Sequence, residues 1–217
     1  MKILNHLTSG GKKRAFFYAF VVFCLILFLV FTHFFWPTFD VQVMSLIRQD
    51  QGKIFSAAMA FISWWGTSYV SILSVFVAAL LFWAASYKRE SWFVLSVFAA
   101  DAVNILLKFA FNRARPQAID IFPKFQQASF PSGHVVHYAV FFGFILTVML
   151  VQPRIHWIVR WGIGLLCVLL IAGVAVARIY LGTHWPTDTL VAYIIGFMML
   201  AVVILQYLKG LRSHHEH

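Results

Sequence analysis

Long stretches without charge constrain this chain more than any other feature. No Asp, Glu, Lys or Arg interrupts residues 15–39 or residues 54–87. A helix of about 20 apolar residues is long enough to cross a bilayer. Hydrophobic residues make up 62% of the 217 residues and charged residues 11%, far from the balance of a soluble globular domain. We therefore expect an all-α integral membrane bundle.

Turn and charge signals divide the apolar sequence into six predicted transmembrane helices. Gly66-Thr67-Ser68 splits the second uncharged run into a short helix and a span, and Lys88-Arg89-Glu90 marks the turn before the third span. The mixed segment 39–53 is predicted to lie at the membrane surface. The sequence has no internal repeat and no linker, so we interpret 1–217 as a single transmembrane domain. The predicted spans are 15–36, 69–87, 91–111, 133–151, 161–177 and 189–208.

The distribution of basic residues predicts the orientation of the bundle. The net charge is +10, but no soluble domain is left over that could bind nucleic acid, so we expect membrane lipids as partners and no nucleic acid. Cytoplasmic loops of membrane proteins are enriched in Lys and Arg. An orientation with both termini in the cytoplasm places ten basic residues inside and four outside, with three motif residues set aside. The ten are Lys2, Lys12, Lys13, Arg14, Lys88, Arg89, Arg154, Arg160, Lys209 and Arg212.

Three short segments concentrate polar side chains at the ends of predicted spans. They are 108–116 (KFAFNRARP), 130–134 (FPSGH) and 178–188 (RIYLGTHWPTD). Charged groups at membrane depth are costly, which makes them functional candidates. The predicted orientation puts all three segments on the extracytoplasmic face. This agreement is an independent check, because the charge count set the motif residues aside.

The first two segments contain groups suited to binding an anion. Lys108 and Arg115 are seven residues apart, close to two helical turns, and Pro116 predicts that the helix stops there. Ser132 occupies the predicted N-cap of the fourth span, and Gly133 lets the backbone approach a ligand closely. Taken alone, Lys108 and Arg115 are equally consistent with a snorkelling lysine and an interfacial arginine. For Pro-Ser-Gly alone, an ordinary helix cap would be the favoured interpretation.

The third segment contains a candidate nucleophile. Pro186 suits the first turn of the sixth span, so Asp188 falls within that turn and His184 just before it. Asp188 is then close enough in sequence to accept a hydrogen bond from one ring nitrogen of His184, leaving the other free to attack. Without the other two segments, an interfacial histidine would be the better interpretation.

Taken together and in this order, Lys-x6-Arg-Pro, Pro-Ser-Gly-His and Arg-x5-His-x3-Asp resemble the signature of the type 2 phosphatidic acid phosphatase family. The match covers 108–188 directly, and the six-span layout extends it over nearly the whole chain. The family often has serine before the third-segment arginine, whereas this chain has Ala177. We expect this difference to weaken phosphate binding without abolishing the reaction.

The resemblance implies a function and a role for each motif residue. It implies a bacterial, multi-pass cell-membrane phosphatase that hydrolyses phosphatidate, phosphatidylglycerophosphate or a polyprenyl diphosphate. His184 would attack phosphorus and form a phosphohistidine, Asp188 would orient it, and His134 would protonate the leaving oxygen and later activate water. The residues implied to hold the phosphoryl oxygens are Lys108, Arg115, Ser132, Gly133 and Arg178.

The resemblance implies a reaction that needs no metal or other cofactor. The chain agrees, because its seven acidic residues are scattered and form no cluster in the sequence that could hold magnesium. His134 and His137 have the i, i+3 spacing of metal ligands, but no third ligand is evident. Cys24 and Cys167 lie within apolar runs and are predicted to be free core residues.

Two alternatives of other classes stay open, as does the oligomeric state. A small transporter or channel would use Asp101 and Lys108, which share a helix face with Asn104, as pathway residues. The absence of an inverted repeat argues against it. If the protein is not a transporter, we interpret Asp101 as the partner of a buried polar group, and Lys108 is the candidate for that group. The second alternative is a catalytically silent lipid-binding member of the fold, for which Ala177 is the only hint.

Overall fold

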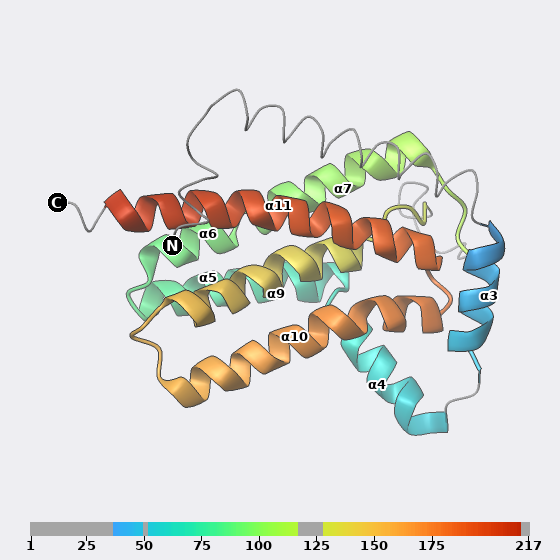
Figure 1. Cartoon of the computed structure of the whole chain (residues 1–217), viewed down its shortest axis with the longest axis horizontal. Helices are drawn as coiled ribbons and strands as arrows, with labels where there is room; N and C mark the ends of the chain where they lie inside the picture. Colours follow the sequence, from blue (N-terminus) through green and yellow to red (C-terminus); the bar gives the residue numbers. More distant parts are fainter. Residues whose placement is uncertain (1–36, 50–51, 117–127, 214–217) are drawn as a thin grey trace, which may run out of the picture. The chain divides into compact units, whose positions relative to one another are not determined.

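The computed structural model describes residues 37–49, 52–116 and 128–213, with side chains described as far as Lys209. Within these ranges the regular structure is entirely helical, which confirms the all-α prediction. The predicted first span, 15–36, lies outside the described residues. The helices are α3 (Pro37–Ile47), α4 (Gly52–Trp64), α5 (Ser68–Ala84), α6 (Lys88–Val94), α7 (Val97–Phe111), α9 (Gly133–Val151), α10 (Trp157–Tyr180) and α11 (Pro186–Ser213) (Figure 1).

The lengths and composition of these helices suit a membrane. Four stretches are long and apolar enough to cross it: Lys88–Phe111, which joins α6 and α7, then α9, α10 and residues Pro186–Lys209 of α11. Helices α4 and α5 meet at a bend of 62°, and they form a fifth candidate if the bent pair counts as one span. This bend contains Gly66 and confirms the predicted division of the second apolar run.

Several predicted boundaries need correction, while α9 begins and ends where the fourth span was predicted. Lys88, Arg89 and Glu90 do not form the turn before the third span. The turn precedes them, with Ser86 at a φ of 67°, and the three charged residues open α6. Helix α10 is also longer than predicted at both ends. Charged and interfacial residues can continue a helix past its apolar stretch, so charge alone places its ends poorly.

Helix α9 is the centre of the described bundle. It packs against α6, α7, α10 and α11, and Figure 1 shows it between α10 and α11. Twelve of its nineteen residues are buried. Small residues bring the neighbouring helices close, as expected for helix packing in membranes. Gly143 lies against Leu200, and Gly196 lies against Ala139.

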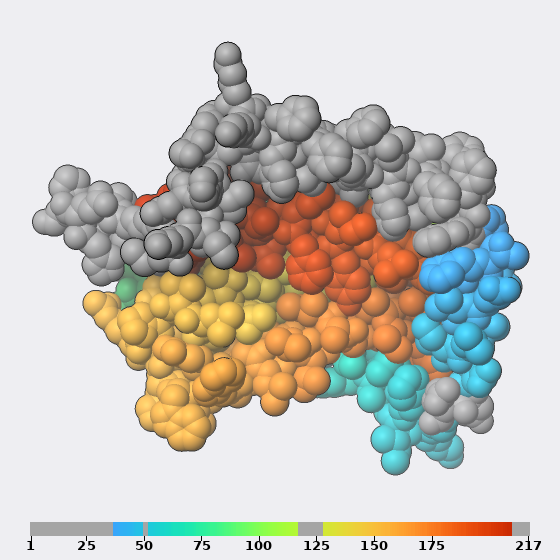
Figure 2. All heavy atoms as spheres, in the orientation of Figure 1, coloured from blue at the N-terminus to red at the C-terminus, as the bar shows by residue number. Residues whose placement is uncertain are grey.

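Other helices expose apolar side chains. On α5, Leu73 and Leu80 are more than 60% exposed, and on α10, Leu165 and Leu169 are more than half exposed. Figure 2 shows α10 in orange along one face of the described residues. Such exposure is unfavourable in water but expected where the neighbouring solvent is lipid.

A buried polar cluster lies where α6 begins and α9 ends. Glu90 is 3% exposed. Its Oε1 accepts hydrogen bonds from Gln152 Nε2 at 2.5 Å and from the Tyr207 hydroxyl at 2.6 Å. Gln152 follows α9, whereas the Pro-Ser-Gly-His segment precedes and opens the same helix. The cluster and the motif segments therefore lie at opposite ends of α9.

The contact between α9 and α11 generates a stability prediction. A Cβ added at Gly196 would lie 2.6 Å from the Cβ of Ala139 and 3.4 Å from the backbone of Val136. We expect Gly196→Ala to lower the free energy of unfolding by about 1–3 kcal/mol, the usual cost of overpacking. Thermal unfolding of the detergent-purified protein measures this loss.

The matched control is Gly162→Ala on α10, because a Cβ there meets nothing within 4 Å. This variant should be as stable as wild type or more stable by up to about 1 kcal/mol, since alanine is the better helix former. Equal unfolding temperatures for Gly196→Ala and wild type would contradict the described packing of α9 on α11.

Candidate active site

The first segment leaves its helix where the third span was predicted to end, and it converges on the other two segments. Helix α7 ends at Phe111, and Asn112 caps it in the left-handed conformation with a φ of 39°. Arg115 therefore lies in the loop, not on the helix. Lys108 Nζ donates to the carbonyl of Ala128 at 2.7 Å, and Arg115 Nη2 lies 3.5 Å from the same oxygen. Arg115 Nη1 donates to the Thr183 carbonyl at 3.0 Å, which ties the first segment to the third.

The second segment begins α9 and contacts the third through its backbone. Ser132 is the N-cap residue as predicted, but its hydroxyl makes no capping hydrogen bond. Its N–H donates to the Asp188 carbonyl at 3.3 Å. Gly133 lies close to α7, because a Cβ there would be 3.0 Å from Asn104 Nδ2. The Ser132 hydroxyl is thus buried beside the third segment without serving as a cap.

The ring of His134 lies against the bend between α4 and α5. A Cβ added at Gly66 would lie 2.3 Å from His134 Cδ2 and 3.0 Å from Nε2. Any side chain at this bend would push the imidazole out of its place. Glycine at position 66 therefore belongs to the site, although the sequence indicated only that it divides two helices.

Arg178 lies in the last turn of α10, where it is 9% exposed. Its Nη1 donates to the hydroxyl of Ser63 on α4 at 2.7 Å. Its carbonyl accepts from the Thr183 hydroxyl at 3.0 Å and the Thr183 N–H at 3.1 Å. The guanidinium is held on one side by Ser63, which the sequence analysis did not identify.

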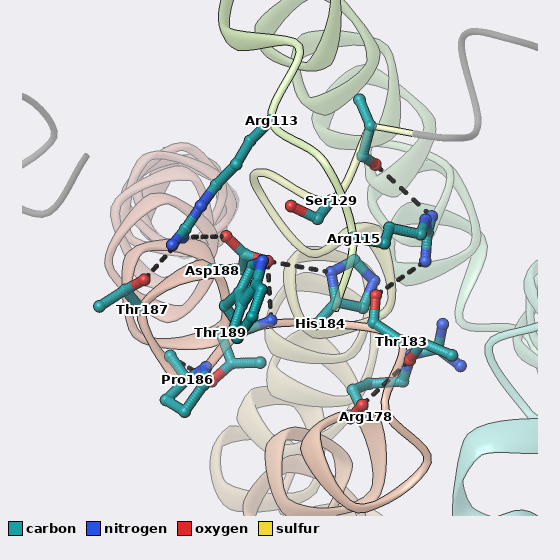
Figure 3. A network of polar contacts seen from close by, with 12 residues as sticks. Arg113, Arg115, Ser129, Arg178, Thr183, His184, Pro186, Thr187, Asp188 and Thr189 are labelled. Atoms are coloured by element: carbon teal, nitrogen blue, oxygen red, sulfur yellow. Dashed lines mark hydrogen bonds and ion pairs between the residues drawn. The ribbon is translucent and has the colours of Figure 1, made fainter. Parts of the chain in front are cut away.

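His184 and Asp188 face each other at the start of α11 (Figure 3). Both are almost completely buried, and Pro186 is the first residue of the helix, as predicted. Asp188 Oδ2 accepts a hydrogen bond from the Trp185 N–H at 2.9 Å and lies 3.7 Å from His184 Nδ1. This distance exceeds that of the predicted hydrogen bond, and catalytic contacts of this kind often shorten only when the substrate binds. Because Nδ1 faces the carboxylate, Nε2 is the ring nitrogen left for chemistry.

Burial and surrounding charge keep His184 neutral. Burial lowers the pKa of His184 well below its ordinary value, and the charges of Arg178, Lys108 and Arg115 lower it further. A hydrogen bond with the Ser129 backbone acts in the opposite direction. Burial also lowers the pKa of Arg115, while the charge of Asp188 raises it. A neutral imidazole beside a carboxylate, near three cations, is suited to attack an anionic group.

Arg113 and Asp40 complete the site, and the sequence analysis missed both. Arg113 Nη1 donates to Asp188 Oδ1 and to the Thr187 hydroxyl, each at 2.7 Å, and Nη2 donates to Asp40 Oδ2 at 2.6 Å. Asp40 lies on α3 and is 1% exposed. The charge count treats Arg113 only as a basic residue of an extracytoplasmic loop. Its position two residues before Arg115 was a signal that it lies near the site. Asp40 carried no comparable signal, because its partners are distant in sequence.

Asp101 has a different partner from the one predicted. Its Oδ2 lies 3.0 Å from His137 Nδ1, whereas Lys108 donates to the Ala128 carbonyl. His137 is therefore held between α7 and α9 by a carboxylate. Within the described ranges, no group of three or more His, Cys, Asp or Glu side chains could hold a metal ion. Cys167 is buried and free, and Cys24 lies outside those ranges.

Four buried polar atoms from these segments have no hydrogen-bond partner in the described part of the chain. They are Ser132 Oγ, His134 Nε2, Arg178 Nε and His184 Nδ1, the last of which faces Asp188. Buried polar side-chain atoms are nearly always hydrogen-bonded in folded proteins. With Lys108 and Arg115 at the same end of the bundle, these atoms suit a ligand that carries several anionic oxygens.

The described helices thus form a membrane bundle, and one end of it brings together two histidines, a carboxylate and several cations. The sequence pattern of the PAP2 superfamily matches residues 89–212, more than half of the chain. The protein belongs to the PAP2 superfamily. This membership confirms the predicted resemblance to the type 2 phosphatidic acid phosphatases.

Comparisons with individual proteins agree with this assignment. The chain is 29% identical over 163 residues to an undecaprenyl-diphosphatase of Sulfolobus acidocaldarius, covering 73% of each chain. The fold is similar to a PAP2-type phosphatidylglycerolphosphate phosphatase from Bacillus subtilis, with a TM-score of 0.74, 19% identity and coverage of 90% of this chain and 96% of the other. It is also similar to Aquifex aeolicus LpxE, with a TM-score of 0.54, 19% identity and coverage of 76% and 93%. At these identities the two structures bear on the fold alone.

Proposed function

We propose that this protein is a membrane phosphatase that hydrolyses a lipid phosphate or lipid diphosphate through a phosphohistidine, without a metal. The observation that carries the proposal is the set of unpaired buried atoms on Ser132, His134 and Arg178, at the same end of the bundle as the His184–Asp188 pair. The superfamily assignment and the similarity to an undecaprenyl-diphosphatase support the same class of reaction.

Binding of the phosphoryl group uses cations and backbone together. Lys108, Arg115 and Arg178 supply positive charge, and Ser132 and the Gly133 N–H supply hydrogen bonds at the start of α9. Negative charge spreads over the phosphoryl oxygens in the transition state, so donors fixed in advance stabilise it more than they stabilise the substrate. The contacts of Arg115 with Thr183 and of Arg178 with Ser63 hold these donors in place.

The reaction proceeds in two displacements. His184 Nε2 attacks phosphorus, the P–N bond forms, and the P–O bond to the lipid breaks as His134 protonates the departing oxygen. Asp188 stabilises the imidazolium that forms on His184. In the second step His134 takes a proton from water, the water oxygen attacks phosphorus, and the P–N bond breaks to release inorganic phosphate.

The site lies at helix ends, so the substrate keeps its apolar tail in the bilayer and presents its phosphate there. Candidate substrates are phosphatidate, phosphatidylglycerophosphate and polyprenyl diphosphates. Pro116 and Trp185, neighbours of Arg115 and His184, border a cleft of about 390 Å³. Its remaining lining residues are Val41, Met44, Ser45 and Arg48. We place the part of the substrate next to the phosphate in this cleft.

Substitution of the two histidines tests the mechanism. His184→Ala should abolish the phosphoenzyme, because this histidine is the proposed nucleophile and no other group stands in its place. His134→Ala should lose about 100-fold or more of the rate on phosphatidate and recover part of it on a phosphate ester with a good leaving group. Phosphate release and acid-labile, base-stable labelling measure the two effects, with excess EDTA present throughout. If EDTA abolished the activity and a divalent metal restored it, the proposal of a metal-free reaction would be wrong. If His184→Ala kept near-normal activity, the assignment of His184 as the nucleophile would be wrong.

The pKa of His184 generates a pH prediction. The neutral imidazole is the nucleophile, and its pKa lies well below 6.5, so kcat/KM should stay high as the pH falls through 6.5 and decline only below it. Lys108→Met removes one of the cations that lower this pKa, so the pKa rises and the acid limb moves to higher pH. Lys88→Met, an exposed change on α6, should leave the limb unmoved. All three proteins are compared on the same substrate, so the titration of the substrate itself affects each profile equally. An acid limb that moves to lower pH in Lys108→Met would contradict this account.

The proposed orientation has both termini in the cytoplasm of a bacterial cell and the active site outside. Ala114, in the loop that carries Arg113 and Arg115, and Arg154, between α9 and α10, are both exposed. In a background without Cys24 and Cys167, Ala114→Cys should react with an impermeant thiol reagent added to intact cells, and Arg154→Cys should react only after lysis. The reverse pattern would place the active site in the cytoplasm.

A further inference from the structure

We infer that Asp40 and Arg113 are positioning residues that set the orientation and the effective charge of Asp188 toward His184. This inference rests on the proposed function, because it gives these two residues a part in the histidine chemistry. Neither residue was among the predicted site residues, although Arg113 lies within the first motif segment.

The two oxygens of Asp188 have separate partners. Oδ1 accepts a hydrogen bond from Arg113 Nη1 at 2.7 Å, and Oδ2 accepts from the Trp185 N–H and faces His184 Nδ1. A carboxylate can otherwise rotate about its Cβ–Cγ bond. Because Arg113 holds Oδ1, the other oxygen is left pointing at the histidine (Figure 3).

Arg113 is itself fixed from two further directions. Its Nη2 donates to Asp40 Oδ2 at 2.6 Å, and its Nη1 also donates to the Thr187 hydroxyl. Its guanidinium stacks over the ring of Trp185, with 5.6 Å between the carbon Cζ and the ring centroid. Since the guanidinium is a rigid planar fork, fixing both terminal nitrogens determines its orientation.

Asp40 joins α3 to the first turn of α11. Its Oδ1 accepts from the Thr187 N–H at 2.8 Å, and its Oδ2 accepts from the Thr187 hydroxyl at 2.7 Å. This carboxylate thus acts as a helix cap supplied by another helix, where the dipole of α11 favours negative charge. Both of its oxygens accept hydrogen bonds, from Thr187 and from Arg113.

The charges explain why two carboxylates share one arginine. Arg113 carries one positive charge and contacts both Asp40 and Asp188, so it neutralises neither of them completely. Asp188 therefore keeps negative charge for the imidazolium that forms on His184 when the P–N bond is made. Without the charge of Asp40, Arg113 would pair with Asp188 alone and draw that charge away from His184.

The test compares two variants on dioctanoyl phosphatidate in detergent micelles. Asp40→Asn keeps the shape but removes the charge, and Arg113→Lys keeps the charge but cannot hold both carboxylates with one planar fork. For each we expect kcat to fall about 10- to 100-fold, the scale of a misplaced catalytic group. The KM should stay within about twofold, since the phosphate-binding residues are untouched. A raised KM at unchanged kcat, or a kcat within twofold of wild type for both variants, would overturn the inference.

A double-variant cycle separates positioning from stability. If Asp40 acts through Asp188, Asp40→Asn should cost less than about threefold in an Asp188→Asn background, whereas a general loss of structure would cost its full factor in both backgrounds. Glu90→Gln is the matched control, because it makes the same change in a buried carboxylate at the other end of α9, and its kcat should stay within twofold of wild type. Full additivity, or an equal loss in Glu90→Gln, would contradict a positioning role. Wild-type protein that releases no phosphate from any lipid phosphate would refute the proposed function instead, whatever Asp40→Asn does.

Discussion

The cost of placing polar groups in hydrocarbon determines where this protein can carry chemistry. Helices satisfy their own backbone hydrogen bonds in a bilayer, but ionised side chains are costly away from water. The chain meets this constraint by confining its buried polar networks largely to the two ends of α9. One network joins Glu90, Gln152 and Tyr207, and the other joins α3, α7, α9, α10 and α11 around His184. Every proposed step of the reaction takes place in the second network.

The helix ends also explain how distant segments form one rigid site. Lys108 lies in the last turn of α7, Arg178 in the last turn of α10, and Asp188 in the first turn of α11. Each helix is positioned by packing along its length, so its end is held without support from a loop. The Ser132 N–H contact with the Asp188 carbonyl links the start of α9 to the start of α11. The geometry of the site is thus a consequence of the packing around α9.

The sequence predicted those parts of the fold and site that depend on local pattern. The uncharged runs predicted an all-α membrane bundle, and α9 has the predicted bounds because Pro-Ser-Gly at its start and Gln152-Pro153 at its end frame one apolar run. Helix α7 also ends at the predicted residue, Phe111, because Asn112 adopts the left-handed conformation and stops the helix four residues before Pro116. Asp40 and Ser63 were missed because their role comes from partners 73 and 115 residues away. Local spacing carries no information about such contacts.

The shared contact of Lys108 and Arg115 with the Ala128 carbonyl bears on how the enzyme ends its cycle. This neutral carbonyl lies 2.7 Å from Lys108 Nζ and 3.5 Å from Arg115 Nη2, so both half-buried cations have an uncharged partner. Under the proposed reaction, inorganic phosphate is left among these same cations after the P–N bond breaks. The carbonyl then competes with the product for both side chains and lowers the affinity for it. A backbone oxygen outside the three motifs would in this way limit inhibition by the product and favour turnover.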